Sequence, residues 1–142
     1  MKTQNFFFLV VSLLLLFTYC SEPPNWVEVV TDSDPPGIVS DIIVKNIPGG
    51  AIITYKLPAD NDLMGVKAIY YYSENGQILE SFSSEARDTI ELNGFPDTNI
   101  RTVKLVCIDK SRNESLPVEI DIQPLTPPVE IVWQTIKMRE TF

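Results

Sequence analysis

The sequence predicts an all-β fold, an antiparallel β-sandwich of about seven short strands. Three observations lead to this prediction. Apolar and polar residues alternate with a period of two in short runs, which is the pattern of half-buried strands. Turn residues separate these runs at regular spacing, and the chain has 11 prolines and 6 glycines. No stretch carries a convincing helical period, so strands are expected throughout the domain.

The composition indicates one folded domain that does not bind nucleic acid. The chain has 142 residues, of which 44% are hydrophobic and 21% are charged. This is long enough to bury a core, and it is not the composition of a disordered segment. The 19 acidic and 11 basic residues give a net charge of -8, and such a surface repels a phosphate backbone.

Residues 1–19 are predicted to form a signal peptide. Lys2 is followed by an apolar run over residues 6–17 that only Ser12 interrupts. Such a run has the length of a signal-peptide core and is too short to span a bilayer. These residues are therefore left out of the fold prediction.

Cys20 follows this run, and an acidic, proline-containing stretch comes next. This context resembles a bacterial lipobox, with Tyr19 where that pattern prefers a small residue. The resemblance implies that the mature chain begins at Cys20 and is held by lipid on Cys20, in the outer membrane or at the cell surface. Ordinary secretion, which would leave the protein periplasmic, and a retained membrane anchor are the alternatives. A lipidated Cys20 leaves Cys107 without a disulfide partner.

Residues 20–36 are predicted to be an acidic, proline-rich tether that is extended and solvated. Trp26 is the large aromatic residue in this tether. It is expected either to pack on the edge of the domain or to contact a ligand, and packing is the more usual role of a tryptophan in a linker.

The β-sandwich domain is expected over residues 37–124, organised around two strands at 50–57 and 66–72. A turn-rich loop with Pro58 joins these two strands. In the first, one face carries the apolar side chains Ala51, Ile53, Tyr55 and Leu57. In the second, Tyr71 falls on the face opposite Tyr70 and Tyr72, so Tyr71 is expected at the outer surface.

The other strands follow from the same alternation, at residues 40–47, 77–83, 87–92, 101–109 and 116–122. Asn75-Gly76 favours a tight turn before the fourth strand. Phe95 lies in a crossing loop and is expected to close one end of the core, whereas Cys107 is expected to be a small buried apolar residue. An immunoglobulin-like arrangement buries every apolar face if the first, second and fifth strands face the third, fourth, sixth and seventh.

Two segments resemble the fibronectin type III family. Tyr55-Lys56-Leu57-Pro58 stands where that family has a Trp-x-x-Pro signature in its second strand, and Asp109-Lys110-Ser111-Arg112-Asn113-Glu114-Ser115 looks like its turn between the last two strands. Residues 37–130 are also similar to a domain of unknown function in Bacteroidetes surface lipoproteins. Asn93-Gly94-Phe95 and Leu125-Thr126-Pro127-Pro128 carry this second resemblance.

Those lipoproteins resemble components of Sus-like polysaccharide-utilisation systems. The resemblance implies that polysaccharide or Sus-like outer-membrane proteins are partners of this chain. In that family a discoidin-type carbohydrate-binding domain usually follows. Residues 125–142 are accordingly expected to be a proline-rich spacer and, over residues 130–136, the first strand of a second domain that is missing here. A natural end of the chain and a truncated gene are both compatible with this expectation.

The sequence does not predict an enzyme. It contains no histidine, and Cys107 is expected inside a strand, so Ser-His and Cys-His pairs are excluded. Asp32-Ser33-Asp34 and Asp60-Asn61-Asp62 could each begin a calcium loop, but neither continues with the glycine and glutamate of an EF-hand. Both are interpreted as turn formers, and no metal or cofactor is expected.

The functional prediction is a non-catalytic, lipid-anchored surface module that acts as a spacer or docking domain in a polysaccharide-utilisation system. The alternative is direct carbohydrate binding by exposed aromatic residues, because sugar rings present apolar faces that stack on such side chains. Tyr71, Trp26 and Trp133 are the candidates. Against this alternative, a tyrosine on a strand usually serves to cover its own sheet.

Overall fold

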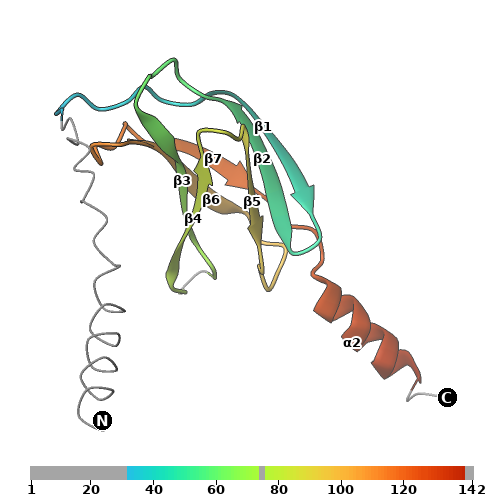
Figure 1. The fold of residues 1–142 in the computed structure, drawn as a ribbon. Helices are drawn as coiled ribbons and strands as arrows, with labels where there is room; N and C mark the ends of the chain where they lie inside the picture. Colours follow the sequence, from blue (N-terminus) through green and yellow to red (C-terminus); the bar gives the residue numbers. More distant parts are fainter. Residues whose placement is uncertain (1–31, 74–75, 140–142) are drawn as a thin grey trace, which may run out of the picture.

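The computed structural model describes residues 32–73 and 76–139 as an antiparallel β-sandwich followed by a helix (Figure 1). The elements are β1 (Ser40–Ile47), β2 (Gly50–Lys56), β3 (Leu63–Tyr71), β4 (Ile78–Ser84), β5 (Thr89–Asn93), β6 (Arg101–Asp109), β7 (Val118–Ile122) and α2 (Pro128–Arg139). The predicted signal peptide, Cys20 and Trp26 lie outside the described residues. The predicted tether lies there too, except for its last five positions.

The predicted division of the strands between two sheets is confirmed. One sheet has the order β1-β2-β5, and the other has the order β4-β3-β6-β7. Every neighbouring pair is antiparallel. The first, second and fifth strands therefore face the third, fourth, sixth and seventh, as the apolar faces required.

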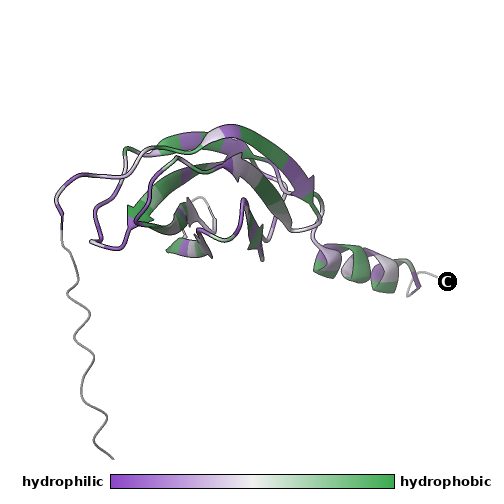
Figure 2. Ribbon diagram, turned by 45° about the horizontal axis from the view of Figure 1, so that its top comes forward, coloured by the Kyte–Doolittle hydropathy of each residue, from purple (hydrophilic) through white to green (hydrophobic). Residues whose placement is uncertain are grey.

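The core lies between the two sheets. The side chains of Ala51, Ile53 and Tyr55 are 0–3% exposed, which confirms the alternation predicted for β2. Apolar and polar residues likewise alternate along the strands in Figure 2. The other large core side chains include Val66, Tyr70, Leu92, Phe95, Val103, Leu105 and Ile122. The alternation also predicts Tyr72 on the inner face, but β3 ends at Tyr71 and Tyr72 is 41% exposed.

A tight turn between β1 and β2 fixes where the chain leaves the sandwich. Ile47 pairs with Gly50, so Pro48 and Gly49 alone form the turn, and Gly49 takes a φ of 67° that favours glycine. Gly49 N donates to Leu125 O over 2.8 Å, and Leu125 N donates to Ile47 O over 3.0 Å. The segment before α2 is thereby fixed to the three-stranded sheet.

The strand expected over residues 130–136 is wrong, as is the expectation that no stretch is helical. These residues lie in α2, which extends away from the end of the sandwich (Figure 1). Pro128 suits the first turn of a helix, and Glu130 near its start and Lys137 and Arg139 near its end complement the helix dipole. None of the side chains of α2 is buried. No helix of the described residues is long and apolar enough to cross a membrane.

Candidate functional site

The four-stranded sheet carries a hollow of about 470 Å³ on its outer face, near the end of β3. We call it the Tyr71 hollow. Its wall is formed by β3, β4, β6 and the loop before β6. The wall residues include Ile69, Tyr71, Ile78, Ile100, Arg101 and Lys104. Two segments that are distant in the sequence, the β3–β4 hairpin and residues 100–104, therefore meet at one surface.

The rim of the Tyr71 hollow is apolar and open to solvent. Tyr71 pairs with Ile78 across β3 and β4. The exposed fractions of Tyr71, Ile78 and Ile100 are 53%, 52% and 65%. The outward orientation predicted for Tyr71 is confirmed, and its role in binding stays a prediction. Exposed apolar side chains gathered at one place are typical of an interaction site.

Among the described residues, the charged residues that line the Tyr71 hollow are the cations Arg101 and Lys104, and each of them pairs with a carboxylate. Arg101 is 6% exposed, and its Nη2 lies 2.6 Å from Asp97 Oδ1. The guanidinium also lies over the ring of Phe95, 5.7 Å from its centroid, and Nε is buried with no hydrogen-bond partner among the described residues. Lys104 Nζ lies 3.1 Å from Glu119 Oε1, and both side chains are more than half exposed.

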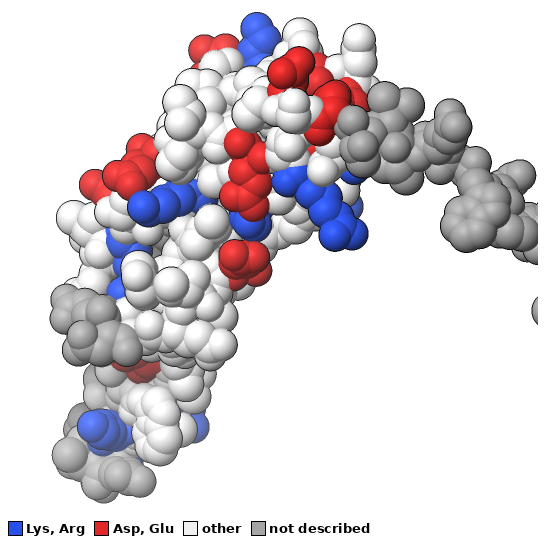
Figure 3. All heavy atoms as spheres, turned by 90° about the vertical axis from the view of Figure 1, so that its left-hand side faces the viewer, with Lys and Arg blue, Asp and Glu red and all other residues white. Residues whose placement is uncertain are grey.

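Charge is unevenly distributed on the surface. Figure 3 shows one face of the molecule, on which acidic and basic side chains gather over the half that lies away from α2. Most of the described atoms nearer α2 on this face are uncharged. The protein therefore combines a net negative charge with a continuous uncharged surface.

The other predicted site residues do not join the Tyr71 hollow. Trp133 lies on α2 with 59% of its surface exposed, and α2 contributes nothing to the wall of the hollow. Trp26 and Cys20 lie outside the described residues, so their roles stay predictions.

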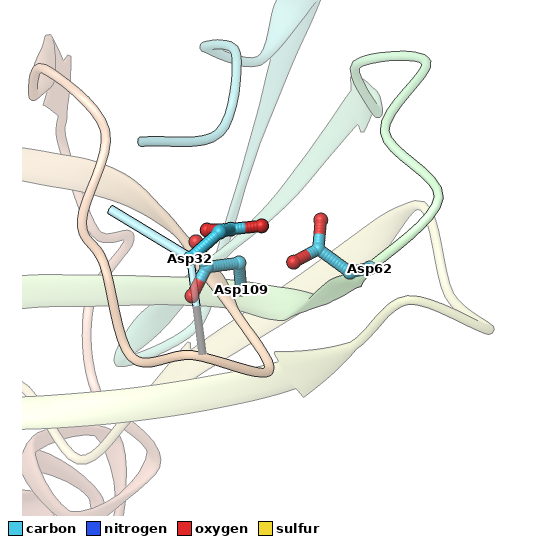
Figure 4. Close-up of side chains that lie close together, drawn as sticks. All are labelled: Asp32, Asp62 and Asp109. Carbon is cyan, nitrogen blue, oxygen red and sulfur yellow. The ribbon is translucent and has the colours of Figure 1, made fainter. Parts of the chain in front are cut away.

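A second cluster of functional side chains lies at the opposite end of β3, where three aspartates meet (Figure 4). Asp62 precedes β3, Asp109 ends β6, and Asp32 comes from the segment before β1. One carboxylate oxygen from each lies within 4.8 Å of the others. Oxygen donors of this kind are the ligands that a hard cation such as Ca²⁺ takes in proteins.

Hydrogen bonds from Asn113 hold two of these aspartates together without a cation. Its amide nitrogen Nδ2 donates to Asp109 Oδ2 over 2.8 Å and to Asp32 Oδ1 over 3.1 Å, and its backbone N–H donates to Asp109 Oδ1 over 2.8 Å. Asn113 thus ties the segment before β1 to the turn after β6. Both oxygens of the buried Asp109 already accept a hydrogen bond.

The aspartate cluster raises the pKa of Asp62 above its ordinary value. The largest cause is the hydrogen bond with the Asp60 carboxyl, followed by loss of solvent and by the charges of Asp32, Asp60 and Asp109. Ionising a group whose pKa is raised by folding destabilises the folded state. The stability contributed by protonated Asp62 is therefore present below the ordinary aspartate pKa and is lost as the pH rises through the raised value.

Replacing Asp62 with asparagine is expected to raise the urea midpoint of unfolding at neutral pH, because it removes one of the repelling charges. The advantage should shrink as the pH falls toward 3, where the wild-type carboxyl is protonated. Glu85→Gln is the matched control, since it removes the same charge at an exposed position. If Asp62→Asn raised the urea midpoint at neutral pH by no more than Glu85→Gln does, the electrostatic explanation would be contradicted.

Burial raises the pKa of two side chains in the core, Cys107 and Tyr55. Cys107 is 1% exposed, as predicted, and burial raises the pKa of its thiol. A buried thiol of raised pKa is a poor nucleophile. The Tyr55 hydroxyl is also buried, and it has no hydrogen-bond partner of good geometry in the part of the chain that the structure describes. The nearby Ser83 hydroxyl donates to Thr89 O over 2.9 Å instead, and burial raises the pKa of Tyr55.

Sequence reasoning missed both the composition of the Tyr71 hollow and the aspartate cluster. The two Asp-x-Asp motifs were interpreted as separate turns, whereas the fold brings Asp32 of one motif next to Asp62 of the other. The approach of Asp62 to Asp109 follows from the pairing of Leu63 with Asp109 in β3 and β6, which the sequence alone does not reveal. No signal in the sequence placed Ile100, in a polar loop, beside Tyr71.

Comparisons with known proteins agree with this fold. The model of a family described as "Domain of unknown function (DUF4959)" matches residues 36–124. A search of the curated proteins finds no match to the chain.

Two of the similar solved structures are fibronectin type III domains. That of the human collagen α-1(XX) chain has a TM-score of 0.57 and 16% identity, covering 69% of this chain and 93% of the other. That of human contactin 1 has a TM-score of 0.52 and 11% identity, covering 76% of this chain and 97% of the other. At these identities the likeness shows the fold alone, a fibronectin type III-like sandwich.

Proposed function

The chain belongs to the DUF4959 family of domains of unknown function, and from this premise we propose that it is a non-catalytic surface module. It would be anchored through lipid on Cys20 and would serve as a spacer or docking domain in a polysaccharide-utilisation system. The Tyr71 hollow is the observation that carries the docking role, because it gathers exposed apolar side chains on the outside of a folded sandwich.

The non-catalytic part of the proposal rests on the side chains available for chemistry. The chain has no histidine, and Cys107 is enclosed in the core. Glycoside hydrolysis would need two carboxyl groups on either side of a bound sugar. The described residues that line the Tyr71 hollow include no carboxylate.

The anchor is tested by labelling the protein with radioactive palmitate in cells. Wild type and Cys107→Ala should incorporate the label, and Cys20→Ala should not. Cys107→Ala is the matched control, because it removes the one other cysteine of the chain. Equal labelling of wild type and Cys20→Ala would refute a lipid on Cys20.

Direct carbohydrate binding is a second candidate function, and the exposure of Tyr71 favours it. The ring is 53% exposed at the rim of a hollow whose neighbouring side chains, Ile78 and Ile100, are also apolar and accessible. An aromatic face of this kind can stack on the apolar C–H face of a sugar, while the tyrosine hydroxyl remains available for a hydrogen bond.

Affinity electrophoresis against a panel of plant and host polysaccharides tests this binding. At least one polysaccharide should retard the wild type, and Tyr71→Ala should lose most of the retardation. Phe82→Ala is the matched control, because Phe82 is 51% exposed on the same face of the same sheet and lies outside the hollow. Trp133→Ala should retain binding as well. Retardation that survives Tyr71→Ala would exclude the Tyr71 hollow as the site.

A further inference from the structure

We propose that the Tyr71 hollow selects an anionic sugar, one that carries a carboxylate or a sulfate ester, over its neutral counterpart. The sugar ring would rest on Tyr71, and its anionic group would be held by Lys104, with Arg101 in the wall behind. This inference rests on the carbohydrate binding proposed above and names the class of sugar that the same site takes.

The charge of the hollow differs from that of the whole protein. The chain carries a net charge of -8, so an anion is repelled by most of its surface. Among the described residues, the charged residues that line the hollow are the cations Lys104 and Arg101. Lys104 lies on the exposed face of β6, and the Arg101 side chain lies on the buried face, where it pairs with Asp97. An occupant that matches both features of the hollow has an apolar face and a negative group.

Lys104 can reach an anion in the hollow. It lies on β6, where it pairs with Ile69 of β3, the strand that carries Tyr71. Its present partner is Glu119 at 3.1 Å, and the side chains of Lys104 and Glu119 are 52% and 57% exposed. An ion pair this exposed is weak, because water and salt screen it. The ammonium group can therefore turn from Glu119 to a ligand at little cost.

Arg101 is the second cation of the wall, and it is paired with Asp97. Its side chain is 4% exposed and is held by Asp97, which is itself 38% exposed. Asp97 occupies Nη2, and the buried Nε has no partner among the described residues. The guanidinium therefore has hydrogen-bonding capacity that the described protein atoms do not use.

The test compares polysaccharides that share a backbone and differ in their anionic groups. The purified full chain is run in gels that contain polygalacturonate or its fully methyl-esterified form, and chondroitin sulfate or desulfated chondroitin. Mobility is expressed relative to a gel without polysaccharide. At least one acidic member should bind about tenfold more tightly than its neutral or less charged counterpart, as one charged hydrogen bond predicts. Added salt should reduce this difference.

Lys104→Gln should abolish the preference for the anion, and Lys104→Arg should largely restore it. Lys45→Gln is the matched control, because it removes the same charge from an exposed position on the other sheet. A preference shown by the carboxylate pair identifies a uronic acid, and one shown by the sulfate pair identifies a sulfated sugar.

Two outcomes would overturn the inference and separate it from the proposed function. If neutral polysaccharides bind through Tyr71 and the acidic ones bind no better, the selectivity is wrong and the carbohydrate binding stands. If neither acidic nor neutral polysaccharides retard the protein, both proposals fail. An anion preference that Lys104→Gln and Lys45→Gln reduce equally would reflect net charge and would also refute the site.

Discussion

Replacing Tyr55 with alanine is expected to lower the free energy of unfolding by about 3–5 kcal/mol, the usual cost of deleting a large aromatic side chain from a core. The ring is 3% exposed and belongs to the core cluster on the inner face of β2. A loss of this size would remove much of the stability of a small domain. Urea melts at neutral pH measure it.

Tyr55→Phe separates the ring from its hydroxyl. The buried hydroxyl has no hydrogen-bond partner of good geometry among residues 32–73 and 76–139, so removing it should leave stability unchanged or slightly increased. Burial also raises the pKa of Tyr55 above its ordinary value of 10.0. Stability is therefore retained below that pH and lost as the pH rises through the raised pKa, so wild type should weaken relative to Tyr55→Phe in strong alkali. If Tyr55→Phe lowered the free energy of unfolding as much as Tyr55→Ala does, this account would be contradicted.

Phe95→Ala should have an effect of similar size, also about 3–5 kcal/mol. Phe95 is 1% exposed, and its ring centroid lies 5.3 Å from that of Tyr70. It also lies beneath the guanidinium of Arg101, so the variant removes an aromatic contact and a cation–π contact together. Its backbone N–H donates to Gly49 O over 3.0 Å, which closes this end of the sandwich.

Urea melts of Phe95→Ala and Phe82→Ala give the comparison. Phe82 is 51% exposed, so its removal should change the free energy of unfolding by no more than about 0.5 kcal/mol. If the two variants lost equal stability, Phe95 would not be the residue that closes the core.

The fold could be predicted in detail because each strand carries its own evidence. In β2 the alternation places Ile53 and Tyr55 on one face. Antiparallel pairing joins such strands into two sheets with one apolar face each, and the two apolar faces pack together to form the core. The helix could not be predicted in the same way. Glu130 to Ile136 is a short apolar run, and such runs fit a strand or a helix by periodicity alone. Pro128 in the first turn and the charges that complement the helix dipole favour the helix.

Only those features of the site that depend on a single strand could be predicted from the sequence. The outward orientation of Tyr71 follows from its position within β3. The proximity of Lys104 depends on the register between β3 and β6, in which Ile69 pairs with Lys104. The aspartate cluster depends on the same pairing, and also on the path of the segment before β1. Contacts set by register between distant strands leave no local pattern in the sequence.

The central claim is that the Tyr71 hollow is the ligand-binding surface of this module. The most direct measurement is an NMR titration of protein labelled with ¹³C in its tyrosine rings, using the polysaccharide that retards it most. Tyr71 should shift most strongly, while the core residue Tyr55 should stay in place, and Tyr71→Ala should abolish the remaining ligand-dependent shifts. A titration in which Tyr71 does not move, or in which the Tyr71→Ala protein responds as wild type does, would contradict the claim.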